Sequence, residues 1–365
     1  MTVLANDTFL RALRREPTSH VPVWLMRQAG RYLPEYAKLR ARAGSFMALA
    51  KNPELAAEIA LQPLARFALD AAILFSDILT IPDAMGLGLS FTEGEGPRFA
   101  RTTVDERTIA ALSAPDLEEL RYVFDAVRTT KHALAGRVPL IGFAGSPFTL
   151  ACYMVEGGAS ADFANVRTMA FARPDLLDRI VRINAVAVAD YLAEQARAGA
   201  DVLMLFDTWA GMLSPAAYRR FSLAPIGSVL ERLPRDVRTI VFAKGVAASL
   251  PALVTCGASC IGVDWTVDLG DARRQYGDRV AFQGNLDPLA LLANPESIRR
   301  AVADMIAAAG EQPGYVFNVG HGLVPSTPPD HVAALVDAVH GARSSRVEAT
   351  CSERSGTAAT VDGRG

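Results

Sequence analysis

The stretch DVLMLFDTWAGMLSP, residues 201–215, places an apolar run before an Asp-Thr pair and a helix start signal. The run at 201–206 is short and almost wholly apolar, which is typical of a strand buried on both faces. Ser214 and Pro215 combine an N-cap residue with a proline at the first helical position. A buried strand, a polar turn and a helix form the repeating unit of α/β folds with a parallel sheet.

The rest of the chain repeats this unit. The predicted strands are 21–25, 72–76, 138–143, 201–206, 238–243, 260–264, 280–284 and 315–319. Further helix starts are indicated at Asn52-Pro53, at Asn294-Pro295 and, by the proline alone, at Arg173-Pro174. Eight strands alternating with helices predict a closed (β/α)8 TIM barrel in a single α/β domain, although an open doubly wound sheet has similar content.

Composition and charge limit the classes of function. The chain has 365 residues, half of them apolar, and a net charge of −2, so it has no general attraction to nucleic acid or to anionic lipid. No apolar run approaches the roughly 18 residues of a membrane span, and the polar N-terminus does not resemble a secretory signal. We therefore expect a cytoplasmic protein. The four cysteines form neither a disulfide framework nor a paired Cys-x-x-Cys zinc pattern.

The C-terminal end of the chain differs from the remainder. Residues 342–365 are polar and contain few large apolar side chains. Such a composition predicts disorder. We therefore expect one barrel domain over residues 1–341 and a disordered tail over 342–365.

Polar side chains follow the predicted strands at the points where these strands end. They are Arg27, Arg31, Asp77, Tyr153, Asp207, Thr208, Lys244, Asp264, Asn285, Asn318 and His321. The active site of a (β/α)8 barrel lies at the C-terminal ends of its strands. The sequence therefore predicts that these groups converge on one rim.

Two arginines stand four residues apart in LMRQAGRYLPEY, residues 25–36. An arginine on a glycine-containing loop presents a planar bidentate donor to a carboxylate or phosphate at any physiological pH. The alternative is that Arg27 or Arg31 pairs with a nearby acid such as Glu35. The position at a strand end favours an anion clamp.

His321 lies between Gly320 and Gly322, and paired glycines let the backbone expose one imidazole at a strand end. The remaining histidines lack such a setting, and we expect them on the surface. They are His20, His132, His331 and His340.

Eight blocks of the sequence resemble, in order, those of the uroporphyrinogen decarboxylase family. They are PVWLMRQAGRYLPEY, FSDILTIPDAMG, GFAGSPFTLACYMVEGG, LFDTWAG, VFAKG, VDW, QGNLDP and FNVGHGLVPSTPPDHV. The resemblance extends from about residue 7 to about residue 341. It implies a (β/α)8 homodimer that converts uroporphyrinogen III to coproporphyrinogen III in haem biosynthesis, without a metal or an organic cofactor.

The resemblance also assigns roles to particular residues. It implies that Asp77 and Arg27 are catalytic. The implied substrate-binding residues are Arg27, Gln28, Ala29, Gly30, Arg31, Asp77, Tyr153, Thr208 and His321. Each of three side chains also has a purely structural interpretation: Asp77 as the cap of a turn, Tyr153 as a packing residue, and Thr208 as a helix cap.

The chemistry of the implied reaction fits these residue types. Protonation of a pyrrole carbon gives a cationic ring that accepts the electrons left by departing carbon dioxide, and a carboxylate near the pyrrole N–H groups stabilises that charge. Asp77 is the predicted carboxylate. The proton donor stays open among Arg27, His321, a substrate carboxylic acid and a water molecule.

Three other classes of function fit parts of the sequence. A corrinoid-related methyltransferase of the same fold needs zinc held by His and Cys, but Cys256 and Cys260 lack a histidine at ligand spacing. A non-catalytic tetrapyrrole-binding protein needs the arginines but not Asp77. A structural or interaction protein explains the core but not the polar strand ends.

Overall fold

The computed structural model of the protein describes residues 4–92 and 96–356, with side chains described for 4–91 and 96–342. Its described strands form a parallel sheet of seven, in the order β1-β4-β5-β6-β7-β8-β9, and a separate antiparallel pair, β2-β3. The strands are β1 (Ala72–Ile73), β2 (Leu89–Thr92), β3 (Gly96–Phe99), β4 (Leu140–Gly145), β5 (Val202–Asp207), β6 (Arg238–Ala243), β7 (Cys260–Val263), β8 (Ala281–Leu286) and β9 (Tyr315–Val319).

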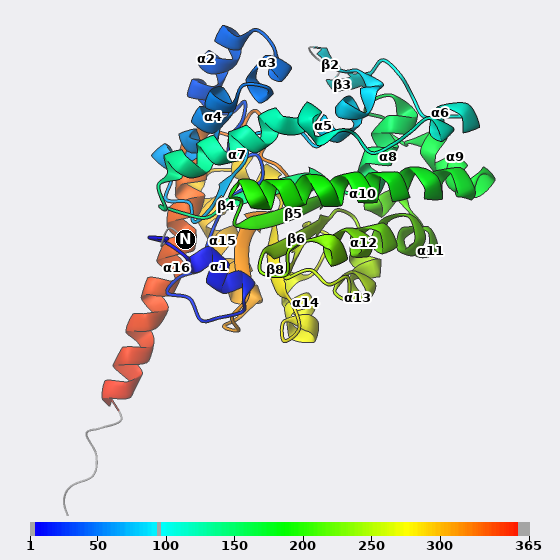
Figure 1. The fold of residues 1–365 in the computed structure, drawn as a ribbon. Coiled ribbons are helices and arrows are strands. Elements are labelled where there is room, and N and C mark those ends of the chain that lie inside the picture. The colour runs from blue at the N-terminus through cyan, green and yellow to red at the C-terminus, as the bar shows by residue number, and fades with distance from the viewer. Residues whose placement is uncertain (1–3, 93–95, 357–365) are drawn as a thin grey trace, which may run out of the picture.

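Helices cover the outside of this sheet. They are α1 (Thr8–Leu13), α2 (Pro34–Ala43), α3 (Phe46–Ala50), α4 (Pro53–Arg66), α5 (Thr80–Pro82), α6 (Glu106–Ala110), α7 (Arg121–Leu134), α8 (Pro147–Glu156), α9 (Ala164–Ala172), α10 (Pro174–Ala198), α11 (Pro215–Tyr218), α12 (Ala224–Arg232), α13 (Leu250–Leu253), α14 (Leu269–Tyr276), α15 (Pro295–Ala309) and α16 (Pro329–Gly356). Figure 1 shows the long helix α10 running past the sheet, in contact with α7 and α12.

The predicted helix starts are confirmed. The side chains of Asn52, Ser214 and Asn294 each accept a hydrogen bond from the backbone N–H three residues later, and a proline follows each of them. Such a side chain satisfies one of the amide groups that the first turn of a helix leaves unpaired. The helix at Pro174 begins with the proline and has no side-chain cap.

A segment without a regular strand closes the barrel. Val23 forms a single parallel bridge with Phe317 of β9, and its carbonyl accepts the N–H of Asp70, just before β1, at 2.8 Å. The predicted strand at 21–25 therefore lies between the two edge strands of the sheet but forms one bridge instead of a ladder. Pro22 has no N–H to donate, which limits the pairing.

The prediction of a (β/α)8 barrel fold is confirmed, and the open sheet is excluded by this closure. The other seven predicted strands correspond to β1, β4, β5, β6, β7, β8 and β9. The sequence analysis missed the hairpin of β2 and β3, where Arg98 bridges to Gly158 just after α8. Its glycine and proline residues gave no strand pattern.

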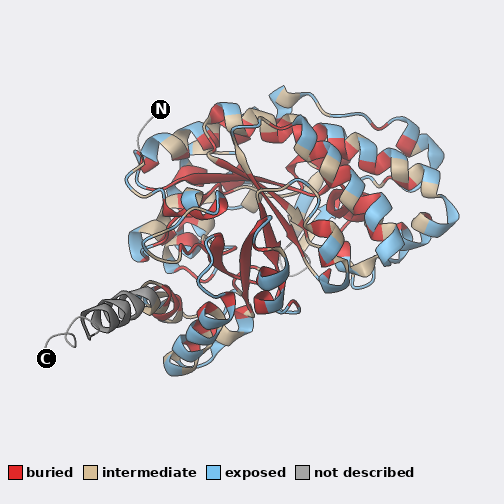
Figure 2. Ribbon diagram, turned by 90° about the horizontal axis from the view of Figure 1, so that it is seen from below, coloured by how far each residue is buried: buried red, intermediate tan, exposed pale blue. Residues whose placement is uncertain are grey.

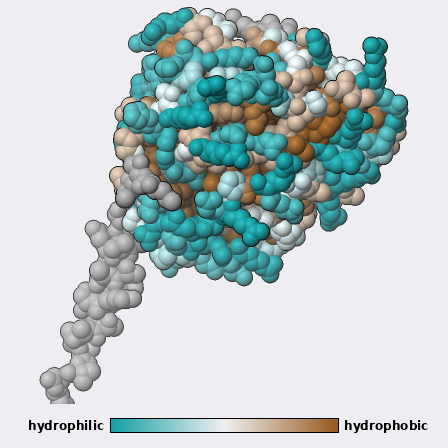
Figure 3. Space-filling model, viewed as in Figure 1, coloured by the Kyte–Doolittle hydropathy of each residue, from teal (hydrophilic) through white to brown (hydrophobic). Residues whose placement is uncertain are grey.

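Figure 2 shows the buried strands at the centre and helices whose inner sides are buried and outer sides exposed. The face seen in Figure 3 is hydrophilic over most of its area, with apolar side chains between the polar ones. None of the described helices combines the length and the apolar character needed to cross a bilayer. Helix α16 extends into the predicted tail as far as Gly356, while residues 357–365 lie outside the described residues, so the disorder of this tail stays a prediction.

Candidate active site

The loop after the 21–25 segment is held by the side chain of Gln28. Its Oε1 accepts the backbone N–H of Leu25 at 3.0 Å, and its Nε2 donates to the carbonyl of Ala71 at 3.1 Å. The Tyr32 hydroxyl donates to the Gln28 carbonyl at 2.7 Å. Gln28 is buried, and both ends of its amide are occupied. Its amide therefore shapes the loop, and its contact with substrate stays a prediction.

This loop places Arg27 at the rim. Arg27 is exposed and has a φ of 61°, a left-handed conformation that is uncommon for residues other than glycine. The residue before it, Met26, is hydrogen-bonded both to β9 and to the loop after β9. Its N–H donates to Asn318 Oδ1 at 3.0 Å, and its carbonyl accepts the N–H of Leu323 at 2.9 Å. A Cβ atom at Gly322 would collide with the Arg27 side chain. The absence of a side chain at Gly322 thus makes room for Arg27.

Asp77 lies four residues after the end of β1 and is half-buried. Its Oδ1 accepts the backbone N–H of Leu79 at 2.8 Å, so the cap of a turn is confirmed as one of its roles. Among residues with described side chains, no partner is seen for Oδ2. Burial raises the pKa of Asp77 to about 6, while the Leu79 N–H and the charge of Arg27 lower it. Asp77 is thus ionised at neutral pH, with one oxygen available to a ligand.

His321 is half-buried in the loop after β9, between two cations. Burial lowers the pKa of His321 to about 4, helped by the charges of Arg27 and Lys244 and opposed by Asp264. The imidazole is therefore neutral at neutral pH. Lys244, at the end of β6, has its Nζ 5.8 Å from the centre of the Trp265 ring.

Tyr153 faces the same group of charges from α8. The ring lies against Phe163 and Trp209, with centroid distances of 5.8 and 6.2 Å. Burial raises the pKa of Tyr153, Asp77 raises it further and Arg27 lowers it. The charge of Arg27 acts on Asp77, Tyr153 and His321 alike, which is consistent with the prediction that these four side chains belong to one site.

The other predicted site residues show fewer interactions with Arg27, Asp77, Tyr153 and His321. Arg31 is exposed, and its charge partly opposes the rise in the pKa of Tyr36 that burial causes. Glu35, the alternative partner of the arginines, pairs instead with Arg66, with an N–O distance of 2.5 Å. Thr208 is half-buried directly after β5, and Ser214 rather than Thr208 caps the next helix. Ala29 and Gly30 are half-buried in the loop.

Several rim side chains that follow the strands hold neighbouring loops. Asn285 Nδ2 donates to the carbonyls of Asp264 and Val267, both at 2.8 Å. The carboxylate of Asp264 accepts the N–H groups of Gly245 and Thr266 at 2.5 and 2.9 Å. These residues converge on the rim as predicted, but their polar atoms are used within the protein.

Asp207 is a functional candidate whose surroundings sequence reasoning did not find. It is fully buried at the end of β5, and its carboxylate accepts hydrogen bonds from Ser146 and Ser222, both at 2.6 Å, and from Thr149 at 3.4 Å. Burial raises the pKa of Asp207 to about 6, and the three hydroxyl groups lower it. Because Ser146 is the N-cap of α8, Asp207 fixes the helix that carries Tyr153.

A row of aromatic rings crosses the inside of the barrel. Phe206 lies edge-on to Phe143 and Phe242, with centroid distances of 5.5 and 6.1 Å. Phe242 in turn lies 6.2 Å from the ring of His321. Phe206 is half-buried, so the row presents an apolar surface next to the charged group. Its members belong to apolar runs in the sequence, where a core residue and a ligand-binding residue look alike.

The three cysteines whose side chains the structure describes do not form a metal site. Cys152 and Cys260 are buried, Cys256 is half-buried, and burial raises the pKa of each thiol. The cluster of possible metal ligands among the described residues is instead His20, Asp70 and His340. His20 and His340, which were predicted on the surface, are half-buried, and both hydrogen-bond to the buried Asp70 before β1, away from the rim. His331 is also half-buried and contacts the Leu291 carbonyl, whereas His132 is exposed.

Known proteins resemble the chain over nearly its whole length. A family model described as "Uroporphyrinogen decarboxylase (URO-D)" matches residues 4–342. A uroporphyrinogen decarboxylase of Cupriavidus necator is 58% identical over 93% of this chain and 97% of its own length, and one of Neisseria meningitidis is 56% identical over 93% and 98%. A solved methyltransferase from Methanosarcina mazei shares the fold at a TM-score of 0.75, with 21% identity over 92% of this chain and 98% of its own.

Proposed function

The chain belongs to the uroporphyrinogen decarboxylase family, and from this premise we propose that it removes the four acetate carboxyl groups of uroporphyrinogen III as carbon dioxide, giving coproporphyrinogen III in haem biosynthesis. The observation that carries the assignment of roles is the carboxylate of Asp77. It is half-buried, its pKa of about 6 leaves it mainly ionised at neutral pH, the charge of Arg27 acts on it, and its Oδ1 accepts the Leu79 N–H.

Asp77 stabilises positive charge on the substrate. A proton added to a pyrrole ring carbon makes that ring cationic. The bond between the acetate methylene and its carboxylate then breaks, its electron pair neutralises the ring, and carbon dioxide leaves. Protonation of the methylene carbon and loss of the proton from the ring carbon give the methyl group, so one proton is consumed per carboxylate. A fixed negative charge near the pyrrole N–H groups favours the cationic stage over the neutral one.

The cations and the aromatic row bind the remainder of the substrate. Uroporphyrinogen carries eight carboxylates, and Arg27, Arg31 and Lys244 supply cations for them at the rim. Phe206 and its neighbours offer an apolar surface to the pyrrole rings. Tyr153 and Thr208 stand beside this surface as further polar contacts, with Ala29 and Gly30 contributing backbone groups of the Arg27 loop.

The neutral imidazole of His321 narrows the choice of proton donor. With a pKa of about 4, His321 is a neutral imidazole at neutral pH in the unliganded protein, and its remaining N–H is a very weak acid. His321 is therefore a hydrogen-bonding contact for the substrate. The first proton comes from a substrate carboxylic acid or a water molecule held by Arg27, which places Arg27 in the catalytic group with Asp77.

We further propose that the reaction needs neither a metal ion nor an organic cofactor, because the protonated substrate ring is itself the electron sink. Exhaustive chelation is expected to leave turnover unchanged. The family resemblance also supports a cytoplasmic homodimer, which light scattering coupled to size-exclusion chromatography would test by giving twice the chain mass of 39.0 kDa.

Anaerobic incubation with uroporphyrinogen III, followed by oxidation and chromatography of the porphyrins, tests the function directly. We expect products with seven, six, five and four carboxylates to appear in turn. Unchanged substrate in the presence of folded protein would contradict the assignment. Binding of the product porphyrin without conversion would instead favour the tetrapyrrole-binding alternative.

A methyltransferase function has less support. The methyltransferase of Methanosarcina mazei is 21% identical, a likeness that shows the fold alone. The His/Cys zinc ligands that such chemistry needs are not found among the described side chains, because the thiols of Cys152 and Cys260 are buried within the packed structure.

A further inference from the structure

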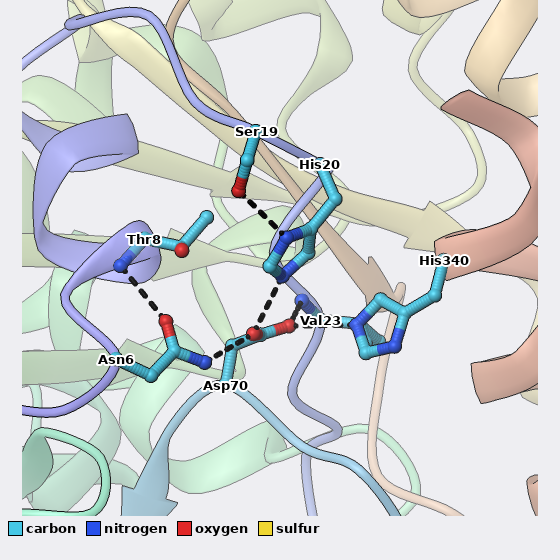
Figure 4. A network of polar contacts seen from close by, with 7 residues as sticks. All are labelled: Asn6, Thr8, Ser19, His20, Val23, Asp70 and His340. Carbon is cyan, nitrogen blue, oxygen red and sulfur yellow. Dashed lines mark hydrogen bonds and ion pairs between the residues drawn. The ribbon is translucent and has the colours of Figure 1, made fainter. Parts of the chain in front are cut away.

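Figure 4 shows a cluster of two histidines, His20 and His340, around Asp70. Asp70 precedes β1, whereas Asp77 follows it. His20 Nε2 lies 2.8 Å from Asp70 Oδ1, and His340 Nε2 lies 3.0 Å from Asp70 Oδ2. The two imidazole rings meet edge-on, with their centroids 4.7 Å apart. His20 comes from the segment before the barrel closure and His340 from α16, so the cluster joins distant parts of the chain.

We propose that this cluster binds one divalent transition-metal ion of the zinc type, and that the ion is structural and separate from the decarboxylation site. Two imidazole nitrogens and a carboxylate oxygen form a ligand set that suits zinc, with a water molecule as the fourth ligand. The ligand atoms of His20, Asp70 and His340 all lie within 4.8 Å of one another. Ligands of one zinc ion stand about 3–3.6 Å apart, so small rotations of the two rings admit the ion.

The surroundings of the cluster orient these ligands. Ser19 Oγ lies 3.0 Å from His20 Nδ1, so this nitrogen can donate its proton to Ser19 and leave Nε2 unprotonated for a metal. Asn6 Nδ2 and the N–H of Val23 each donate to one Asp70 oxygen at 2.7 Å, which fixes the plane of the carboxylate. Hydrogen bonds to the atoms of a ligand side chain that do not bind the metal hold that side chain in the orientation for binding.

Burial and access also suit a metal ion. Asp70 has a side-chain exposure of 2%, whereas His20 and His340 each have 27%, so the carboxylate is protected and the imidazoles remain open to solvent. An ion can therefore reach the cluster from outside without unfolding. Because an imidazole–carboxylate hydrogen bond already satisfies each pair, the protein also folds without the ion. The ion replaces these two hydrogen bonds and ties α16 to the start of β1.

The test is a titration of the chelator-treated, dialysed full chain with zinc, and in parallel with cobalt as a spectroscopic probe. The variants are His20→Gln and His340→Gln, whose amides can still donate to Asp70 but ligate zinc poorly. His132→Gln is the matched control, because His132 is an exposed histidine at the end of α7. We expect one ion per chain in the wild type and the control, and binding weakened at least tenfold in both cluster variants.

Three further readouts locate the ion and exclude other sites. Zinc is expected to raise the melting temperature of the wild type and the control but of neither cluster variant, because a ligand that binds the folded state stabilises it. Decarboxylase turnover is expected to stay the same with and without zinc. Cobalt is expected to give visible ligand-field bands without the near-ultraviolet band of a thiolate. Equal binding by all four proteins, no saturable binding by the wild type, or a thiolate band would overturn the proposal.

Discussion

Asp70 and Asp77 lie at opposite ends of the same short strand, and their carboxylates have opposite surroundings. Asp70 accepts hydrogen bonds from Asn6, His20, the Val23 N–H and His340, which together hold its pKa well below its usual range despite burial. Asp77 accepts one hydrogen bond from Leu79, and burial holds its pKa at about 6. The carboxylate before β1 thus stabilises the fold through its hydrogen bonds. The carboxylate after β1 has few hydrogen bonds within the protein, which leaves it able to interact with a substrate.

The largest expected effect is that of Asp77→Asn on the rate. This substitution keeps the shape and the oxygen that accepts the Leu79 N–H, but it removes the charge that stabilises a cationic pyrrole. We expect kcat to fall by about 10²–10³, or roughly 3–4 kcal/mol, with product-porphyrin affinity and melting temperature nearly unchanged. Asp77→Glu keeps the charge in a displaced position, so its loss should be intermediate. Near wild-type single-turnover rates in the Asn variant would contradict this role.

The same substitution at the other end of β1, Asp70→Asn, should leave catalysis intact and lower stability. In the variant, an NH2 group replaces one of the two oxygens. Each oxygen accepts two hydrogen bonds, from Asn6 and His20 or from Val23 and His340, so the new donor faces two other donors in either orientation. We expect the free energy of unfolding to fall by about 3 kcal/mol, measured by urea denaturation. The folded fraction should turn over normally. A lower kcat for Asp70→Asn in a fully folded sample would contradict the proposal that Asp70 stabilises the fold without taking part in catalysis.

The contrast between the two ends also shows what the sequence could predict. Asp77 and Arg27 were found because a strand and the residue after it are adjacent in sequence, so the rim follows once the strands are known. The cluster around Asp70 was missed because its members lie 64, 50 and 270 positions from Asp70 along the chain. No local pattern links such residues.

The contacts that some rim side chains make within the protein could not be predicted, for a related reason. Gln28 stands in the motif between the two arginines, where its amide could equally face the substrate or the loop backbone. The structure shows the backbone contacts, with Leu25 and Ala71. Likewise, the glycine at 322 was interpreted as exposing His321, whereas its close neighbour is the side chain of Arg27, almost three hundred residues earlier. The fold depends on apolar runs, while these contacts depend on how distant loops meet.

A change at Gly322 sharpens the comparison by moving one rim side chain. Gly322→Ala adds a methyl group where the Arg27 side chain lies, so Arg27 must shift away from its position beside Asp77. We expect kcat/KM to fall by about tenfold, because a displaced catalytic group loses its alignment. Gly341→Ala is the control, since an added Cβ there meets open space. Unchanged kcat/KM in Gly322→Ala would show that the position of Arg27 is not critical.

The smallest expected effect is that of mild acid, which should distinguish the two carboxylates without any substitution. Asp77, with a pKa of about 6, loses its charge as the pH falls through 6, whereas Asp70 stays ionised there because its pKa is held far lower. We therefore expect kcat/KM to fall roughly fourfold between pH 7 and pH 5.5, with the protein still folded by circular dichroism. Asp207 also has a pKa of about 6, so a variant is needed to tell which of the two carboxylates causes the fall in kcat/KM. In Asp77→Asn the residual activity should lose this acid limb if Asp77 causes it. An acid limb of the same size in Asp77→Asn would show that protonation of Asp207, which positions α8, causes the loss of activity. A flat profile in the wild type would mean that bound substrate carboxylates or Arg27 control the charge at Asp77 more strongly than its burial does.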